Sequence, residues 1–237
     1  MGGTRTLAGK KHLFFDLDHT LWDFESNSRE TLSELWSDYN LSSYGVQLPK
    51  FLTHFELVNT RLWGQCNIGE IDKHTIRHQR FRLIFQDLID MEVDEVQSIQ
   101  EDYLKICPTK PHVMDGAIEV LEELKPHFDL HLITNGFDEV QATKLSGSGL
   151  DTFFPIVVTS GRAGYLKPKP EIFQFALDEA KAEVHESVMI GDNPESDIEG
   201  AFNFGMDQIF FNPNSLECPI SPSVEIKSLR EIPAILL

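Results

Sequence analysis

Cysteine is scarce in this chain, and its spacing excludes two kinds of protein. Only 3 of the 237 residues are cysteine, namely Cys66, Cys107 and Cys218. Their number is odd, they lie far apart, and no C-x-x-C pair occurs, so the sequence indicates neither a disulfide framework nor a zinc site. We expect reduced thiols in a cytoplasmic protein.

Basic residues and long apolar runs are also scarce. The chain has 20 Lys and Arg against 38 Asp and Glu, a formal net charge of −18. Such a surface repels nucleic-acid phosphates and anionic membranes, so we expect neither a nucleic acid polymer nor a membrane as partner. No apolar run approaches the roughly 18 residues of a membrane span, and no secretory leader pattern occurs. The opening MGGTRT fits the loose pattern for myristoylation, which many proteins without an acyl anchor share.

Short apolar runs that alternate with helical patterns predict the fold class. The predicted strands are residues 12–17, 128–133, 155–159, 187–191 and 208–212. The predicted helices between them are residues 116–125, 138–146, 170–182 and 195–204. Asp138 is placed to cap its helix, and Pro170 and Pro194 to begin theirs. The alternation predicts an α/β protein with a doubly wound, Rossmann-like parallel sheet.

One long interval has helical patterns and no clear strand. Its predicted helices are residues 27–39, 49–63, 73–88 and 94–106. We therefore expect an all-helical insert, residues 24–106, in an α/β core of residues 1–23 and 107–237. Because ligands of open α/β sheets bind at the carboxyl ends of strands, an insert after the first strand would act as a cap.

Two acids follow the first predicted strand. Asp16 and Asp18 are two residues apart, so both point to one side of an extended chain, and Thr20 is placed to hold a carboxylate. Like charges this close need a cation between them or a shared proton. Carboxylate oxygens suit Mg²⁺, which takes one or two of them and keeps several waters.

A second acidic pair stands in GDNPESD. Asp192 ends the predicted strand 187–191, and Asp197 falls in the first turn of the next helix. Acids favour that turn, which is sufficient to explain Asp197 alone. If this strand lies beside the first, Asp192 reaches Asp16 and completes a metal site, with Asp197 orienting Asp192 or a metal-bound water.

Two further motifs are suited to an anion. In LITNG, Thr134 and Asn135 end a predicted strand and a turn follows, whose hydroxyl and backbone N–H groups can hold phosphate oxygens. In LKPKPEIF, flanking prolines fix the backbone around Lys167, which can offset charge as a phosphoryl group moves.

Together these four motifs resemble those of the haloacid dehalogenase-like (HAD) superfamily, in the same order over residues 12–212, and the helical insert resembles its C1 cap. The resemblance implies a Mg²⁺-dependent phosphohydrolase in which Asp16 is the nucleophile and forms an aspartyl-phosphate. Asp18 would be general acid and then general base, in surroundings that favour its neutral form, with its backbone carbonyl on the metal.

The remaining roles implied by the resemblance are divided between phosphate and metal. Thr134, Asn135 and Lys167 would bind phosphate, and Lys167 would also pair with Asp16. Asp16, Asp18 and Asp192 would be the metal ligands. Thr20 and Asp197 would support them.

A narrower resemblance is to the pyrimidine 5′-nucleotidase group, carried by FFDLDHTLWDFESNSRETL and GEIDKHTIRHQRFR. It implies a nucleoside 5′-monophosphate as the small-molecule substrate. Phe24 is placed to stack on a base. Residues 64–78 could form a loop that reaches the substrate, with Glu70, His74 and Arg77 as its polar candidates.

Several alternatives stay open on the sequence alone. A sugar-phosphate or phosphoglycolate phosphatase, or a phosphomutase, would carry the same four motifs. A non-catalytic binding protein could keep the fold, although no nucleophile, acid or metal ligand is missing. We expect a monomer or a homodimer.

Overall fold

The structure is a computed structural model that describes residues 7–89 and 91–237. The MGGTRT pattern lies outside these residues. Contacts divide the chain into two compact units, one of residues 1–24 and 111–237, the other of residues 25–110. Sequence patterns place the same junctions after residues 23 and 106. No helix among the described residues is both long enough and apolar enough to cross a bilayer.

A parallel sheet of six strands forms the centre of the first unit, in the order β3-β2-β1-β4-β5-β6. The strands are His12–Phe15 (β1), Asp129–Thr134 (β2), Ile156–Thr159 (β3), Ser187–Gly191 (β4), Asp207–Phe211 (β5) and Val224–Ile226 (β6). The helices are Ala117–Leu124 (α5), Asp138–Ser148 (α6), Ser160–Ala163 (α7), Pro170–Ala180 (α8), Gly200–Phe204 (α9) and Ile232–Leu236 (α10).

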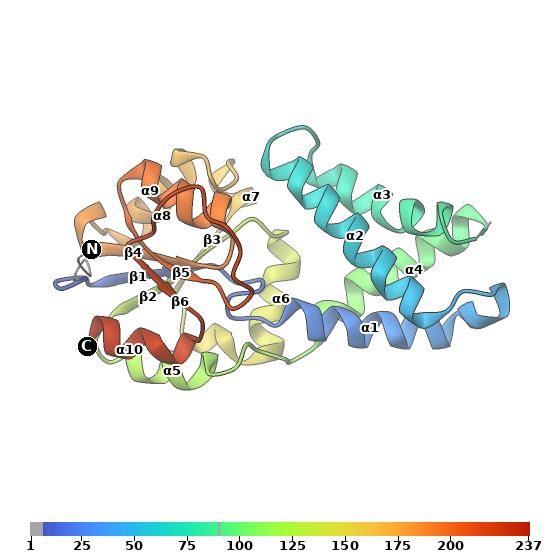
Figure 1. Ribbon diagram of the computed structural model, residues 1–237, viewed down its shortest axis with the longest axis horizontal. Coiled ribbons are helices and arrows are strands. Elements are labelled where there is room, and N and C mark those ends of the chain that lie inside the picture. Colours follow the sequence, from blue (N-terminus) through green and yellow to red (C-terminus); the bar gives the residue numbers. More distant parts are fainter. Residues whose placement is uncertain (1–6, 90) are drawn as a thin grey trace. The chain divides into compact units, whose positions relative to one another are not determined.

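Helices cover both faces of this sheet. In Figure 1, α8 and α9 lie over one face, and α5 and α10 over the other. The central strands are apolar on both sides, as a sheet covered twice requires; Phe14 and Met189, for example, pack with Phe173 of α8 in a fully buried cluster. The predicted doubly wound α/β fold is therefore confirmed.

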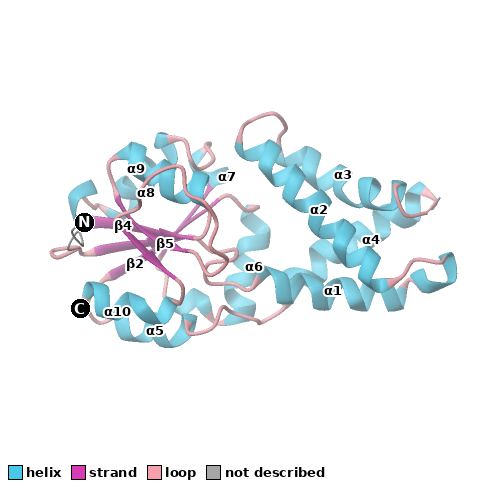
Figure 2. Cartoon of the chain, viewed as in Figure 1, coloured by secondary structure: helices cyan, strands magenta, loops and turns pink. Residues whose placement is uncertain are grey.

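Four α-helices and no strand run through the described residues of the second unit (Figure 2), with the first helix beginning one residue earlier, at Phe24 of the first unit. They are Phe24–Asp38 (α1), Leu48–Asn67 (α2), Lys73–Gln86 (α3) and Val93–Ile106 (α4). Aromatic rings from three of them form its core: Phe55 lies 5.0 Å from Tyr103 and 5.8 Å from Phe81 between ring centroids. Asp72 caps α3 by accepting the N–H of Thr75 at 2.7 Å, as its place in the sequence predicts.

The helix starts differ from the prediction at two places. Phe137, not Asp138, is the N-cap of α6, so Asp138 is the first helical residue and not the cap. The segment predicted as one helix, 195–204, divides into a π-helical stretch, Pro194–Glu199, and α9. Pro194 begins the π-helical stretch, where its missing N–H costs nothing.

Two element boundaries also differ. β1 stops at Phe15, so the first acid lies just beyond the strand instead of within it. α2 continues to Asn67, so the predicted loop 64–78 is shorter, because its first residues are helical and α3 begins at Lys73.

Candidate active site

The acidic motifs meet because their strands are neighbours in the sheet. β1 pairs with β2 on one side and with β4 on the other, with Phe15 level with Leu132 and Ile190. The N–H of Asp16 donates to the carbonyl of Ile190 at 2.9 Å. Asp16 and Asp192 therefore leave the same edge of the sheet, the edge at which α/β proteins bind ligands.

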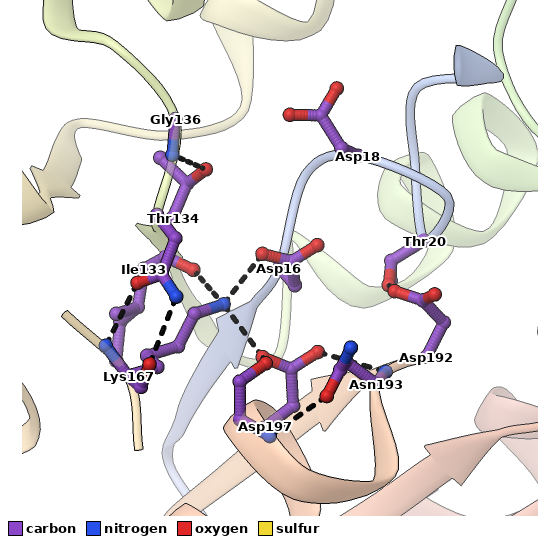
Figure 3. Close-up of polar contacts among 12 residues, drawn as sticks. Asp16, Asp18, Thr20, Ile133, Thr134, Gly136, Lys167, Asp192, Asn193 and Asp197 are labelled. Atoms are coloured by element: carbon purple, nitrogen blue, oxygen red, sulfur yellow. Dashed lines mark hydrogen bonds and ion pairs between the residues drawn. The ribbon is translucent and has the colours of Figure 1, made fainter. Parts of the chain in front are cut away.

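A buried lysine joins two of the carboxylates (Figure 3). The Nζ atom of Lys167 lies 2.5 Å from Asp16 and 2.7 Å from Asp197, and it donates to the carbonyl of Ile133 at 2.7 Å. Lys167 and Asp197 are each only 1% exposed. An ammonium has three donors, and all are used here, so a phosphate oxygen that binds Lys167 must replace one of these partners.

Asp192 completes a group of three carboxylates. It accepts the hydroxyl of Thr20 at 3.1 Å, the support expected of that threonine. One oxygen each from Asp16, Asp192 and Asp197 lie within 4.8 Å of one another. Desolvation, with the nearby Asp197 carboxylate, raises the pKa of Asp192 to about 8. Desolvation also raises the pKa of Asp16, outweighing the opposite effect of Lys167.

The composition of this cluster fits a divalent cation. Three carboxylates and one ammonium leave two negative charges uncompensated in a desolvated site, an arrangement that is costly unless a cation or protons offset it. Oxygen donors of this kind suit a hard ion such as Mg²⁺. The carboxylates placed to hold it are those of Asp16, Asp192 and Asp197. The supporting role expected of Asp197 stays a prediction.

Asp18 stands apart from this cluster. In Figure 3 its carboxylate points away from the other three. It accepts the ammonium of Lys144 at 2.5 Å and the amide of Gln141 at 3.0 Å. Its carboxylate is thus engaged away from the cluster, and the expected contact of its backbone carbonyl with a metal stays a prediction.

The surroundings of Asp18 overturn one expectation. Desolvation raises the pKa of its carboxyl group, but Lys144 and the amide of Gln141 more than offset this, and the pKa lies below its ordinary value. The prediction that the surroundings favour neutral Asp18 is therefore wrong for this arrangement. The reason is the ammonium of Lys144, which lies against the carboxylate and belongs to none of the four motifs.

The turn after β2 holds the residues predicted to bind phosphate. The hydroxyl oxygen of Thr134 accepts the N–H of Gly136 at 3.1 Å and the amide of Gln141 at 2.6 Å, which leaves the hydroxyl proton to donate. The Asn135 side chain makes two hydrogen bonds with the backbone of Lys167. Its Oδ1 accepts the Lys167 N–H at 2.8 Å, and its Nδ2 donates to the Lys167 carbonyl at 3.0 Å. Asn135 thereby fixes the lysine loop.

A family model for the haloacid dehalogenase-like hydrolases matches residues 10–205 of the chain. The chain belongs to this family. The predicted hydrolase is confirmed.

Relatives within the family include several phosphatases. The chain is 29% identical over 228 residues to the pyrimidine 5′-nucleotidase YjjG of Escherichia coli, covering 94% of this chain and 96% of YjjG. It is 31% identical over 242 residues to human N-acylneuraminate-9-phosphatase, covering 97% and 95%. These relatives are consistent with hydrolysis of phosphoric monoesters.

A solved structure of this family agrees with the fold over nearly the whole chain. The magnesium-bound HAD hydrolase YfnB of Bacillus subtilis superimposes with a TM-score of 0.87 at 26% identity, covering 96% of this chain and 98% of that one.

Glycines at two strand ends allow the close contacts of this HAD site. A Cβ on Gly191 would lie 2.3 Å from a carboxylate oxygen of Asp197, and one on Gly136 would lie 2.2 Å from the Gln141 amide nitrogen. Real Cβ atoms do not approach other atoms this closely, so any larger residue would displace these side chains.

Sequence reasoning missed Gln141 and Lys144. Both are buried on α6, one turn apart. Two polar residues three positions apart, directly after the LITNG turn, are a signal in retrospect, because that spacing puts both on one helix face.

The residues predicted to select the substrate are divided between the two units. Phe24 lies in the first unit, half-buried, with its ring 4.9 Å from His19 and 6.2 Å from Trp22 between centroids. Glu70, His74 and Arg77 lie in the helical unit, around the start of α3. Their part in choosing a substrate stays a prediction.

Proposed function

We propose that this HAD hydrolase is a Mg²⁺-dependent phosphomonoesterase that works through an aspartyl-phosphate. The observation that carries the proposal is the cluster at the sheet edge, where the Asp16 carboxylate lies 2.5 Å from Lys167 and has an oxygen within 4.8 Å of oxygens from Asp192 and Asp197. A bound Mg²⁺ would offset the charge of the carboxylates and of the phosphate.

The first step forms a bond between an Asp16 oxygen and phosphorus and breaks the bond from phosphorus to the ester oxygen. Thr134 and Lys167 bind the non-bridging oxygens. Asp18 gives a proton to the departing oxygen. Because its pKa is lowered in the free enzyme, the carboxylate must take up this proton when the negatively charged substrate binds beside it. Because Lys144 bonds one Asp18 oxygen and Gln141 the other, the second oxygen can carry this proton once the neutral amide gives way.

The second step returns the enzyme to its starting form. Asp18, now charged, takes a proton from a water molecule as that water attacks phosphorus. The bond between phosphorus and Asp16 breaks, and inorganic phosphate leaves. The Lys144 ion pair favours the charged form of Asp18 that this step needs.

We propose a pyrimidine nucleoside 5′-monophosphate as the substrate. Support comes from the similarity to the nucleotidases YjjG and PynA, at 29% and 27% identity over 94% of this chain in each case. The Trp22-Asp23-Phe24 segment, next to the catalytic loop, is the most distinctive part of the two stretches that carry the narrower resemblance.

A sugar phosphate is the second candidate. The similarity to human N-acylneuraminate-9-phosphatase, 31% over 97% of this chain, favours it specifically. Both candidates use the same core chemistry, so they differ only in the leaving group that the enzyme accepts.

A panel of phosphomonoesters separates these candidates. Phosphate release would be measured from UMP, dTMP, sugar phosphates and phosphoglycolate, with Mg²⁺ and with EDTA. We expect the largest kcat/KM for UMP or dTMP and no turnover in EDTA. Faster hydrolysis of a sugar phosphate would replace the nucleotidase proposal, and full activity in EDTA would overturn the metal requirement.

A further inference from the structure

Helix α6 places two buried polar residues against Asp18, the group proposed to carry the proton. Gln141 and Lys144 lie one turn apart, 0% and 5% exposed. Polar side chains buried this deeply require partners. Both of them find the same partner, Asp18.

Each oxygen of the Asp18 carboxylate has its own donor. Lys144 Nζ lies 2.5 Å from Oδ1, and Gln141 Nε2 lies 3.0 Å from Oδ2. Gln141 also donates to the hydroxyl of Thr134 at 2.6 Å. The carboxylate is therefore tied to the loop expected to bind phosphate.

An aromatic ring fixes the Lys144 ammonium from another side. Its Nζ atom lies 4.4 Å from the centre of the Trp22 ring, within the range of a cation–π interaction. Its side chain is only 7% exposed. A cation held by a carboxylate and a ring in a nearly dry place has little freedom to move, so it fixes the atom that it binds.

We propose that Lys144 is a positioning residue that holds Asp18 by Oδ1, so that Oδ2 is the oxygen that exchanges protons with the substrate and with water. The proposal rests on the phosphomonoesterase function proposed above. A charge-assisted bond is about twice as strong as a neutral one, so the Gln141 bond gives way first. Without Lys144 the carboxyl group turns more freely, because the terminal torsion of aspartate has a broad, shallow potential.

Leaving-group chemistry tests this role directly. A nucleoside alkoxide must be protonated as it departs, whereas p-nitrophenolate leaves without a proton. Loss of positioning at Asp18 should therefore slow UMP far more than p-nitrophenyl phosphate. The ratio of the two kcat/KM values reports this difference, and it does not depend on how much of the protein is folded.

The experiment compares wild type, Lys144→Met and the exposed control Lys181→Met with Mg²⁺ present. We expect Lys144→Met to lower the ratio of kcat/KM for UMP over p-nitrophenyl phosphate roughly tenfold, part of the 10²–10⁴-fold that a general acid contributes. Lys181→Met should keep the wild-type ratio, and Lys144→Arg, which retains the charge, should recover part of it.

Other outcomes would overturn the proposal. An equal loss on both substrates would make Lys144 merely structural, and an unchanged or higher ratio would mean that it does not position the acid. If Lys144→Met does not fold, the same ratio is measured on Lys144→Gln. If wild type prefers another alkyl phosphate, that ester replaces UMP; if it hydrolyses no phosphomonoester, the proposed function itself fails.

Discussion

Asp16 and Asp18 stand two residues apart, and each lies 2.5 Å from a lysine ammonium, but their surroundings differ. Lys167 is shared between Asp16 and Asp197, with Asp192 close by. Asp18 forms a separate ion pair with Lys144 and also accepts the side-chain amide of Gln141. The pKa of Asp16 is raised and that of Asp18 is lowered.

The difference shows that the balance of charges, and not the nearest contact, decides which form of a buried acid is favoured. One ammonium among three carboxylates cannot offset their mutual repulsion and desolvation. One ammonium against one carboxylate can. The first arrangement therefore calls for a cation, and the second holds a single group in place.

The largest expected effect is the loss of turnover in Asp16→Asn. An amide is a poor nucleophile, so kcat should fall by roughly 10⁴-fold or more, as when other enzymes lose their nucleophile. Phosphate release and circular dichroism would be measured side by side. The exposed control Asp151→Asn should keep full activity, and a folded Asp16→Asn variant with normal turnover would disprove the mechanism.

The other aspartate should fail differently. Asp18→Asn removes the proton donor but leaves the acid cluster intact, so kcat for UMP should fall by about 10²–10⁴-fold with little change in KM. Steady-state kinetics would test this. A variant whose main defect is a raised KM would place Asp18 in substrate binding instead.

A methyl group at Gly191 should disturb only the cluster around Asp16. Its Cβ would lie 2.3 Å from the Asp197 carboxylate, so Gly191→Ala should cost about 1–3 kcal/mol of unfolding free energy. It should also raise the Mg²⁺ concentration needed for half-maximal activity. Urea unfolding and a Mg²⁺ titration would check both.

A glycine elsewhere in the chain provides the matched control. Gly64 lies inside α2, and a methyl group added there would meet open space, so Gly64→Ala should stabilise the protein by up to about 1 kcal/mol. Equal stability changes in the two variants would argue against the crowding at Asp197.

The smallest effect concerns pH and metal. The pKa of Asp192 is raised from 3.8 to about 8, so the folded metal-free protein keeps a proton that the unfolded chain releases. Its contribution to stability is present at acid pH and is lost as the pH rises through about 8. Mg²⁺ competes with that proton.

Thermal unfolding with and without Mg²⁺ would measure this competition. We expect Mg²⁺ to raise the melting temperature more at pH 9 than at pH 6, by roughly 2–4 °C, or about 1 kcal/mol. NaCl of equal ionic strength controls for screening. An equal shift at both pH values would contradict the competition.

The sheet can be predicted from sequence because its central strands are uninterrupted apolar runs buried on both faces. β6 cannot, since it is a three-residue edge strand, Val224–Ile226, whose composition resembles a loop. The π-helical stretch after Asn193 cannot be told from an ordinary helix, because both have similar residue patterns.

The candidate site is predictable only where its residues follow strands. The pairing of β1 with β4 brings Asp192 to Asp16, as strand order implies. The contact between Lys144 and Asp18 could not be predicted, because the two residues lie 126 positions apart and a lysine within a helix normally faces water. Its partner is set by tertiary packing alone.

The chain enters and leaves the helical unit through a short antiparallel pairing in the core. Trp22 bridges Val113, the N–H of Asp23 donates to the carbonyl of His112 at 3.1 Å, and that of Met114 to Leu21 at 2.8 Å. The two segments of the core that flank the insert are thus hydrogen-bonded to each other. We therefore expect that the helical insert could be replaced by another one while the core keeps this pairing and its fold.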